Sequence, residues 1–386
     1  RRRLGSHRRG GAEPRRRHLG YKGRPLACWH ASREELRALC HVMRDLDRGT
    51  ISIALASMKG GTSPISDEEV ALLRLLVEES RRRVTWLPLL SHASEIDFPR
   101  HTLGKLGTLV EQAIPQITPR PMVFLVNLRK PFRFGFYPAW KPALGASPDE
   151  QLRLYQSPQF RAQAKKEMES PERPFRWENF RVIKAVRPEL AHYQGQRVMD
   201  IARAQDKTPL DVLLDLAISD GLDTIFEQQN ANLHPAAVEW LVRDPRLMFG
   251  LSDAGAHVDQ LCDVGNSTAV LAIWVRERGA ISLEEAIRRM TSMPAQLFGL
   301  SSRGQLRVGH IADLVLFDLN TVAAEPPIMV HDLPLGAARM VAHSNGVAAT
   351  FVSGIQVVSD GKLTGERPGR ALRSGDCEGG RRGTRP

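Results

Sequence analysis

Apolar residues in the first third of the chain follow two alternating spacings, which predict helices and strands in turn. Helical spacing follows Ser32 and again follows Ser66, and each serine stands three residues before a glutamate, as in a capping box. Short apolar runs then predict buried strands, at 50–56, 84–90 and 113–118. Strands that alternate with helices in this way indicate a parallel α/β sheet.

The same alternation returns after residue 200. A helix is predicted to begin at Thr208, and strands are predicted at 223–229 and 246–253. Two more helices are predicted around 266–278 and 282–291. The five predicted strands are too few for a complete eight-stranded barrel, and no glycine-rich phosphate turn follows the first of them.

Two regions depart from this alternation. Residues 119–180 are rich in proline and aromatic residues, which is typical of a long insertion. After residue 300, short apolar alternations punctuated by glycine predict antiparallel hairpins, one with Gly354 at its turn. The predicted domains are a basic tail at 1–19, an α/β region at 20–300 with the insertion 119–180, a small β domain at 301–372, and a second tail at 373–386.

Composition and charge narrow the class of protein. The chain has 386 residues, of which 42% are hydrophobic and 25% charged, as in globular proteins. Its net charge of +11 resides at the ends, because residues 1–18 carry +7 and residues 367–386 carry +4. We therefore expect solvated tails and no nucleic-acid partner. No apolar run has the length of a transmembrane helix and no CxxC pair occurs, so we expect no membrane partner and a cytoplasmic location.

The segment LMFGLSDAGAHVDQ, at 247–260, carries the clearest candidate chemistry. Asp253 stands where a predicted parallel strand meets its loop, which is the catalytic face of such folds. Gly255 permits a tight turn, so Asp253 and His257 are predicted to face one cavity; the alternative is a turn-capping aspartate and a surface histidine. Arg120, between two prolines after a strand, is a candidate for binding a substrate carboxylate.

Three segments together resemble the N-acyl-D-amino-acid deacylase (D-aminoacylase) family of the metal-dependent amidohydrolase superfamily. They are SDAGAH at 252–257, MTSMPAQLFGLSSRGQLRVGHIADLVLFD at 290–318, and TGERPGR at 364–370. The resemblance implies a TIM-like (β/α) barrel that holds one or two divalent metals, with zinc expected, and a small-molecule N-acyl amino acid as substrate. It also implies that Asp253 is the general base and a metal-site carboxylate. His92, just after a strand, is the candidate second metal ligand, and His257 and Arg120 are candidates for substrate binding.

The sequence also departs from the family. It has no His-x-His pair, and the resemblance begins near residue 20, so we expect a partial barrel that lacks its first strands. Such a barrel would expose sheet edges, through which the chain could form oligomers. One alternative is an inactive truncated homologue, which would hydrolyse N-acyl-D-amino acids no faster than buffer does. The other alternative is a cyclic amidase or imidazolonepropionase-like hydrolase.

Overall fold

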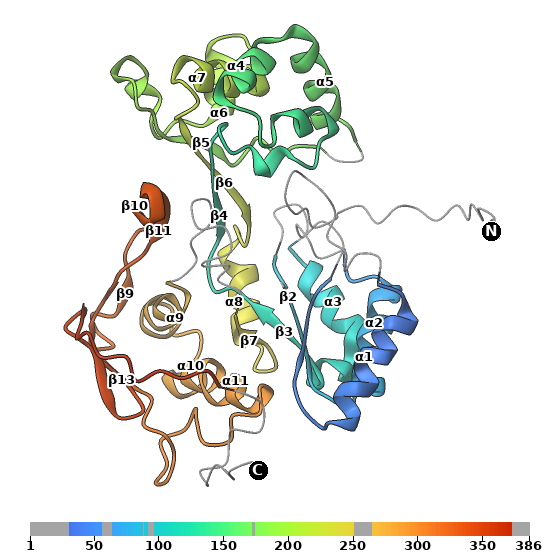
Figure 1. Cartoon of the computed structure of the whole chain (residues 1–386), viewed down its shortest axis with the longest axis vertical. Coiled ribbons are helices and arrows are strands. Elements are labelled where there is room, and N and C mark those ends of the chain that lie inside the picture. Colours follow the sequence, from blue (N-terminus) through green and yellow to red (C-terminus); the bar gives the residue numbers. More distant parts are fainter. Residues whose placement is uncertain are drawn as a thin grey trace, which may run out of the picture.

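The computed structural model describes residues 31–55, 64–87, 89–91, 96–171, 174–250 and 265–372. Figure 1 shows a parallel sheet with helices beside it, drawn in blue and cyan, and a mostly helical group at the top, drawn largely in green. The C-terminal part, in orange and red, passes from helices into antiparallel strands. Among the described helices, none combines the length and the apolar character needed to cross a membrane.

The parallel sheet has four strands within the described residues. Their order is β1 (Ile51–Ala54), β2 (Val84–Leu87), β3 (Ala113–Ile117) and β7 (Met248–Phe249). Every neighbouring pair is parallel, and the register sets Trp86 opposite Pro115 and Ile117 opposite Phe249. The strands predicted at 50–56, 84–90 and 113–118 are thus confirmed. The strand predicted at 246–253 is present only as the two residues of β7, and residues 251–264 lie outside the described part.

Three helices accompany the first strands: α1 (Arg33–Asp45), α2 (Asp67–Ser80) and α3 (Phe98–Leu106). The capping box predicted for α2 is confirmed, because the Ser66 hydroxyl accepts the Glu69 amide at 3.2 Å and the Glu69 carboxylate accepts the Ser66 amide at 3.0 Å. The helices and strands share one core, which includes Leu73, Leu76, Val84, Trp86, Phe98 and Ile117.

The middle of the chain forms an antiparallel sheet in the order β4 (Met122–Val126), β6 (Ile225–Ala231) and β5 (Phe180–Lys184). We had expected residues 223–229 to continue the parallel alternation, and this prediction is wrong. The reason lies in the side chains. Phe226 and Gln228 are buried while Glu227 between them is partly exposed, an alternation typical of antiparallel strands with one covered face.

Helices α4 (Pro148–Gln156), α5 (Pro158–Met168), α6 (Val198–Ala204) and α7 (Pro209–Ser219) pack around an aromatic core on this middle sheet. The Phe134 and Trp140 rings stack with centroids 4.2 Å apart, and both side chains are fully buried. These aromatic residues therefore serve packing. The middle unit runs from residue 122 to residue 231, past the 119–180 segment that composition singled out. Figure 1 shows β4 and β6 running from the helices of this unit towards the rest of the chain.

Four helical segments lead towards the C-terminal sheet: α8 (Pro235–Arg243), α9 (Asn266–Ala269) with the π-helical Val270–Glu277, α10 (Leu283–Met290) and α11 (Ser292–Leu297). The sheet is antiparallel, in the order β15 (Lys362–Leu363), β14 (Ile355–Ser359), β13 (Val347–Val352) and β8 (Leu314–Phe317). The hairpin predicted around Gly354 is confirmed, with φ of 81° at that glycine.

Two short ladders accompany this sheet, and one arginine links the segment before β9 (Ala323–Ala324) to the helices. β9 pairs with β12 (Ser344–Asn345), and β10 (Ile328–Leu333) pairs with β11 (Ala337–Val341). The Arg276 Nη1 donates to the carbonyl oxygens of Leu319 at 3.1 Å and Val322 at 2.7 Å. Arg276 thereby ties the π-helix to the segment that enters β9.

Candidate active site

Polar side chains gather where β2 and β3 end. The carboxyl ends of parallel strands meet at one edge of a sheet, where active sites of such folds are built. Ser91 and Thr118, which follow β2 and β3, are fully buried there, and Asn232, directly after β6, is 2% exposed. We call the following five residues the strand-end cluster: Ser91, Thr118, Arg120, Asn232 and Asn266.

Hydrogen bonds run through this cluster from one strand end to the next. The Ser91 amide donates to Asn232 Oδ1 at 2.8 Å, and the Asn232 amide donates to the Ser91 carbonyl at 2.9 Å. Asn232 Nδ2 donates to the carbonyls of Thr118 at 3.1 Å and Arg120 at 3.3 Å. Asn266 Nδ2 donates to Thr118 Oγ1 at 3.2 Å. Residues far apart in the sequence therefore meet at the carboxyl edge of the parallel sheet.

Two glycines mark close approaches at the same edge. The Gly250 amide donates to the Ile117 carbonyl at 3.0 Å, and a Cβ at Gly250 would lie 2.4 Å from Gln116 Oε1. A Cβ at Gly265 would lie 3.4 Å from Arg120 Nη1. The Arg120 guanidinium thus lies beside the first described residue after 251–264.

The π-helix Val270–Glu277 follows α9, shortly after Gly265. Such helices are rare and frequently occur at functional sites. Trp274 of this helix donates its indole N–H to the Pro119 carbonyl at 2.6 Å, which anchors the helix to the chain between Thr118 and Arg120. The sequence offers no signal for this geometry, because the apolar spacing of residues 266–278 is also that of an ordinary helix.

Of the four predicted site residues, the structure describes only Arg120. Asp253, His257 and His92 lie outside the described residues, whereas Arg120 belongs to the strand-end cluster. The described residues next to the first three are Ser91 on one side, and Gly250 and Gly265 on the other. Asn232 and Asn266 were not predicted from the sequence. Asn232 comes shortly after a predicted strand, which was a usable signal, whereas Asn266 stands at the start of a predicted helix and gave none.

Whether a metal could bind at the carboxyl edge of the parallel sheet depends on the side chains that could act as its ligands. Across the residues that the structure describes, no group of three His, Cys, Asp or Glu side chains could hold a metal ion. Gln116 donates to Thr85 Oγ1 at 3.1 Å and Thr118 accepts from Asn266, so these two neutral side chains have protein partners. Neutral amides and hydroxyls are also poor zinc ligands. The described residues alone therefore do not fit a catalytic zinc.

At the entry to β7 lies a fully buried arginine on α10. Arg289 Nε donates to the Leu247 carbonyl at 2.6 Å, another guanidinium nitrogen donates to the Val242 carbonyl, and the guanidinium carbon lies 4.2 Å from the Phe249 ring centroid. Burial lowers the pKa of Arg289 to about 10, so it remains charged at neutral pH. Arg289 fixes the start of the strand whose far end leads to Asp253.

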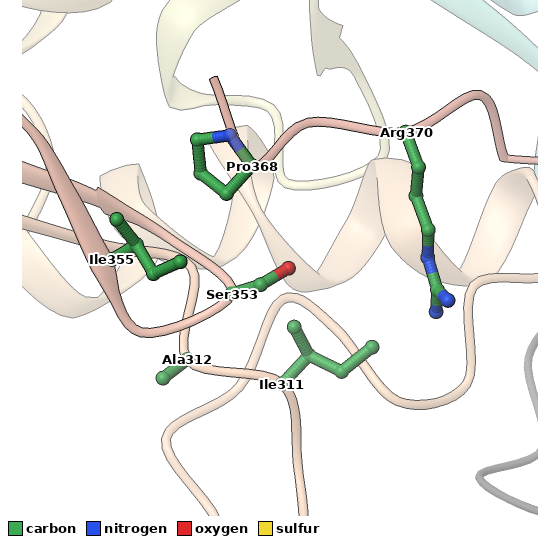
Figure 2. A pocket seen from close by; sticks show the side chains of 6 residues that line it. All are labelled: Ile311, Ala312, Ser353, Ile355, Pro368 and Arg370. Carbon is green, nitrogen blue, oxygen red and sulfur yellow. The ribbon is translucent and has the colours of Figure 1, made fainter. Parts of the chain in front are cut away.

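A separate depression of about 590 Å³ lies on the C-terminal sheet. Figure 2 shows the residues that line it: Ile311, Ala312, Ser353, Ile355, Pro368 and Arg370. These residues include no carboxylate, imidazole or thiol, so they supply neither a general base nor a zinc ligand. Nearby, Asp313 accepts the Ser353 amide at 2.9 Å and pairs with Arg303, which gives Asp313 a structural role.

Comparison with known proteins agrees with the family resemblance that the sequence motifs predicted. The amidohydrolase family profile matches residues 177–362. This part of the chain is therefore similar to the amidohydrolase family. The profile spans strands β5 and β6 of the middle sheet, strand β7 of the parallel sheet and most of the C-terminal sheet, and its range includes Asp253 and His257.

A curated relative supports the narrower resemblance. The chain is 44% identical over 118 residues to the N-acyl-D-aspartate deacylase of Alcaligenes xylosoxydans xylosoxydans, a match that covers 29% of this chain and 21% of that protein. The predicted resemblance to the D-aminoacylase family is thus confirmed. The relatives are hydrolases that act on carbon–nitrogen bonds.

Solved structures of D-aminoacylase share the mixed α/β fold. A variant in complex with copper chloride has a TM-score of 0.54 at 19% identity, over 89% of this chain and 60% of that one. A second D-aminoacylase structure, whose subject is the enzyme's binuclear metal centre, has a TM-score of 0.52 at 19% identity, over 88% of this chain and 58% of that one. The chain therefore spans less than two thirds of the length of each of these three relatives.

Proposed function

We propose that the carboxyl edge of the parallel sheet carries out metal-dependent hydrolysis of the amide bond of an N-acyl-D-amino acid. The observation that carries this proposal is the hydrogen-bonded strand-end cluster. It joins Ser91 to Thr118 and Asn266. Ser91 is the residue before His92, and Asn266 comes two residues after the segment 251–264. The motif residues Asp253, His257 and His92 all belong to the two segments that begin or end at this cluster.

Each proposed residue has a defined task. Asp253 takes a proton from the attacking water and later donates it to the nitrogen of the leaving amino acid. Arg120 binds the carboxylate of the substrate with two parallel N–H donors, and His257 contacts the substrate beside it. A divalent metal, held by Asp253 and His92, would lower the pKa of the water that it binds. The D-amino-acid preference is supported by the deacylase relative.

The second candidate is a homologue that binds the substrate without hydrolysing it. Two observations favour it: no His-x-His pair occurs in the sequence, and the described residues hold no three-ligand metal group. A catalytic zinc normally has three protein ligands and one water. On this alternative, Arg120 would still bind the substrate carboxylate.

Metal content and turnover separate the two candidates. The full chain is dialysed against zinc and then against metal-free buffer, and bound zinc is measured by atomic emission. Release of free amino acid is then measured from N-acetyl-D-aspartate and from its L-enantiomer. Bound zinc with turnover of the D-enantiomer supports the hydrolase. Binding of N-acetyl-D-aspartate without zinc or turnover supports the non-catalytic homologue.

A further inference from the structure

Asn232 has an unusual backbone conformation for a buried polar residue. It follows β6, is 2% exposed and adopts φ of 58°. This left-handed conformation disfavours residues other than glycine, asparagine and aspartate. The chain returns from the middle unit to the parallel sheet at this residue.

The side chain of Asn232 uses both ends of its amide. Its Oδ1 accepts the Ser91 amide at 2.8 Å. Its Nδ2 donates to the carbonyls of Thr118 at 3.1 Å and Arg120 at 3.3 Å. Asparagine meets these three partners because it combines an acceptor oxygen with two N–H donors, whereas a carboxylate has no donor.

These bonds fix the turn from which Arg120 projects. Thr118 and Arg120 lie on either side of Pro119, whose own carbonyl accepts the Trp274 indole N–H. Asn232 holds one side of this turn and Trp274 holds the other. The Arg120 side chain then extends to within 3.4 Å of the Cβ position of Gly265.

We propose that Asn232 is a positioning residue that sets the orientation of Arg120 for the substrate carboxylate. This inference rests on the proposed function for the role of Arg120, but the hydrogen-bonded clamp itself does not. Asn232 holds the turn after β3 against Ser91, which lies four residues after the end of β2. Substrate binding should therefore depend on a residue that does not touch the substrate.

Two substitutions distinguish the role of the Asn232 Oδ1 acceptor from that of the Nδ2 donor. Asn232→Asp retains the acceptor for Ser91 but removes both donors to the Thr118 and Arg120 carbonyls. Asn232→Gly tolerates the left-handed backbone and removes all three side-chain bonds. Asn127→Asp is the matched control. Asn127 Oδ1 accepts the Lys130 amide at 3.0 Å in the middle unit, at the opposite end of the β4–β6 ladder from Asn232.

The experiment measures hydrogen exchange of the full chain together with hydrolysis kinetics. We expect exchange at the Ser91 amide to accelerate about tenfold or more in Asn232→Gly and to stay near the wild-type rate in Asn232→Asp. We expect KM for N-acetyl-D-aspartate to rise about tenfold in both variants, with a smaller change in kcat. Asn127→Asp should match the wild type in both measurements.

The outcomes distinguish this inference from the proposed function. Unchanged Ser91 exchange in Asn232→Gly would overturn the clamp, and wild-type KM in folded Asn232→Asp would overturn the positioning of Arg120. If the wild type hydrolyses nothing, the proposed function fails, and the positioning of Arg120 is decided by the dissociation constant of N-acetyl-D-aspartate instead of KM. Should Asn232→Gly fail to fold, Asn232→Asp, which keeps the side-chain volume, decides the inference.

Discussion

At the scale of the residue, the proposed reaction depends on two charged side chains. Asp253 moves the proton and Arg120 recognises the carboxylate, and the surrounding cluster supplies neutral hydrogen-bonding groups. Neutral neighbours suit this task, because buried amides and hydroxyls hold a charged substrate in place without adding a competing charge. Asp253 and Arg120 should therefore respond to substitution in different kinetic parameters.

Substitution Asp253→Asn should abolish hydrolysis while the fold is retained. Asparagine keeps the shape of the side chain but cannot accept the proton of water, and loss of a general base typically costs on the order of 10²–10⁴-fold in rate. Steady-state turnover measures the effect, and circular dichroism checks the fold. Full activity in the variant would remove Asp253 from the catalytic role.

Substitution Arg120→Lys should raise KM about tenfold with little change in kcat. Lysine keeps the charge but loses the two parallel donors, and carboxylate binding is present in both the ground state and the transition state. An N-acetylated amine that lacks the carboxylate serves as the control substrate and should be hydrolysed equally by both proteins. An equal loss with both substrates would contradict carboxylate recognition by Arg120.

At the scale of the element, sequence patterns predicted the parallel strands β1 to β3, helix α2 and the hairpin at Gly354. They failed for β6, because the pattern of the seven residues 223–229 does not show which strand they will pair with. The strand-end cluster was also not predicted, since Ser91, Asn232 and Asn266 come together only through tertiary pairing. The spacing of apolar residues indicates which side of one helix or strand is buried, whereas a functional site depends on how several helices and strands are arranged.

The contact between α1 and α2 should depend on pH. Glu79 accepts hydrogen bonds from His41 at 2.9 Å and Arg37 at 3.2 Å, and these bonds, the one from His41 first, lower its pKa. A lowered folded-state pKa stabilises the protein above the unfolded value of about 4.3, and the stabilisation is lost as pH falls through the folded-state pKa. Thermal midpoints of Glu79→Gln and wild type should thus differ at pH 7 and converge in acid.

The exposed neighbour Glu78 gives a control on the same helix. Glu78→Gln changes the net charge of α2 by the same amount but leaves the hydrogen bonds to Glu79 intact, so it should follow the wild type at every pH. A Glu79→Gln midpoint equal to that of the wild type at pH 7 would contradict a stabilising role for this contact.

At the scale of the whole molecule, the C-terminal sheet exposes apolar side chains. Val315 and Leu316 of β8 are 57% and 61% exposed, and Leu363 of β15 is 84% exposed. Within the described residues β8 and β15 each pair with one strand only. Exposed apolar surface and unpaired edges favour association between chains.

We therefore expect the weight-average mass in light scattering to rise with protein concentration. Leu316→Lys should lower this rise, because it sets a charge on the exposed sheet. Leu306→Lys is the control, since Leu306 is 86% exposed but lies outside the strands. A concentration-independent monomer mass for the wild type would contradict association through the sheet.

The claim that the carboxyl edge of the parallel sheet is a metal-dependent amidohydrolase site is tested most directly by one assay. The full chain, loaded with zinc, is given N-acetyl-D-aspartate with and without a chelator, and free aspartate is measured over time. The account predicts release of aspartate that the chelator stops and that added zinc restores. Release no faster than in buffer, with zinc bound to the chain, would contradict it.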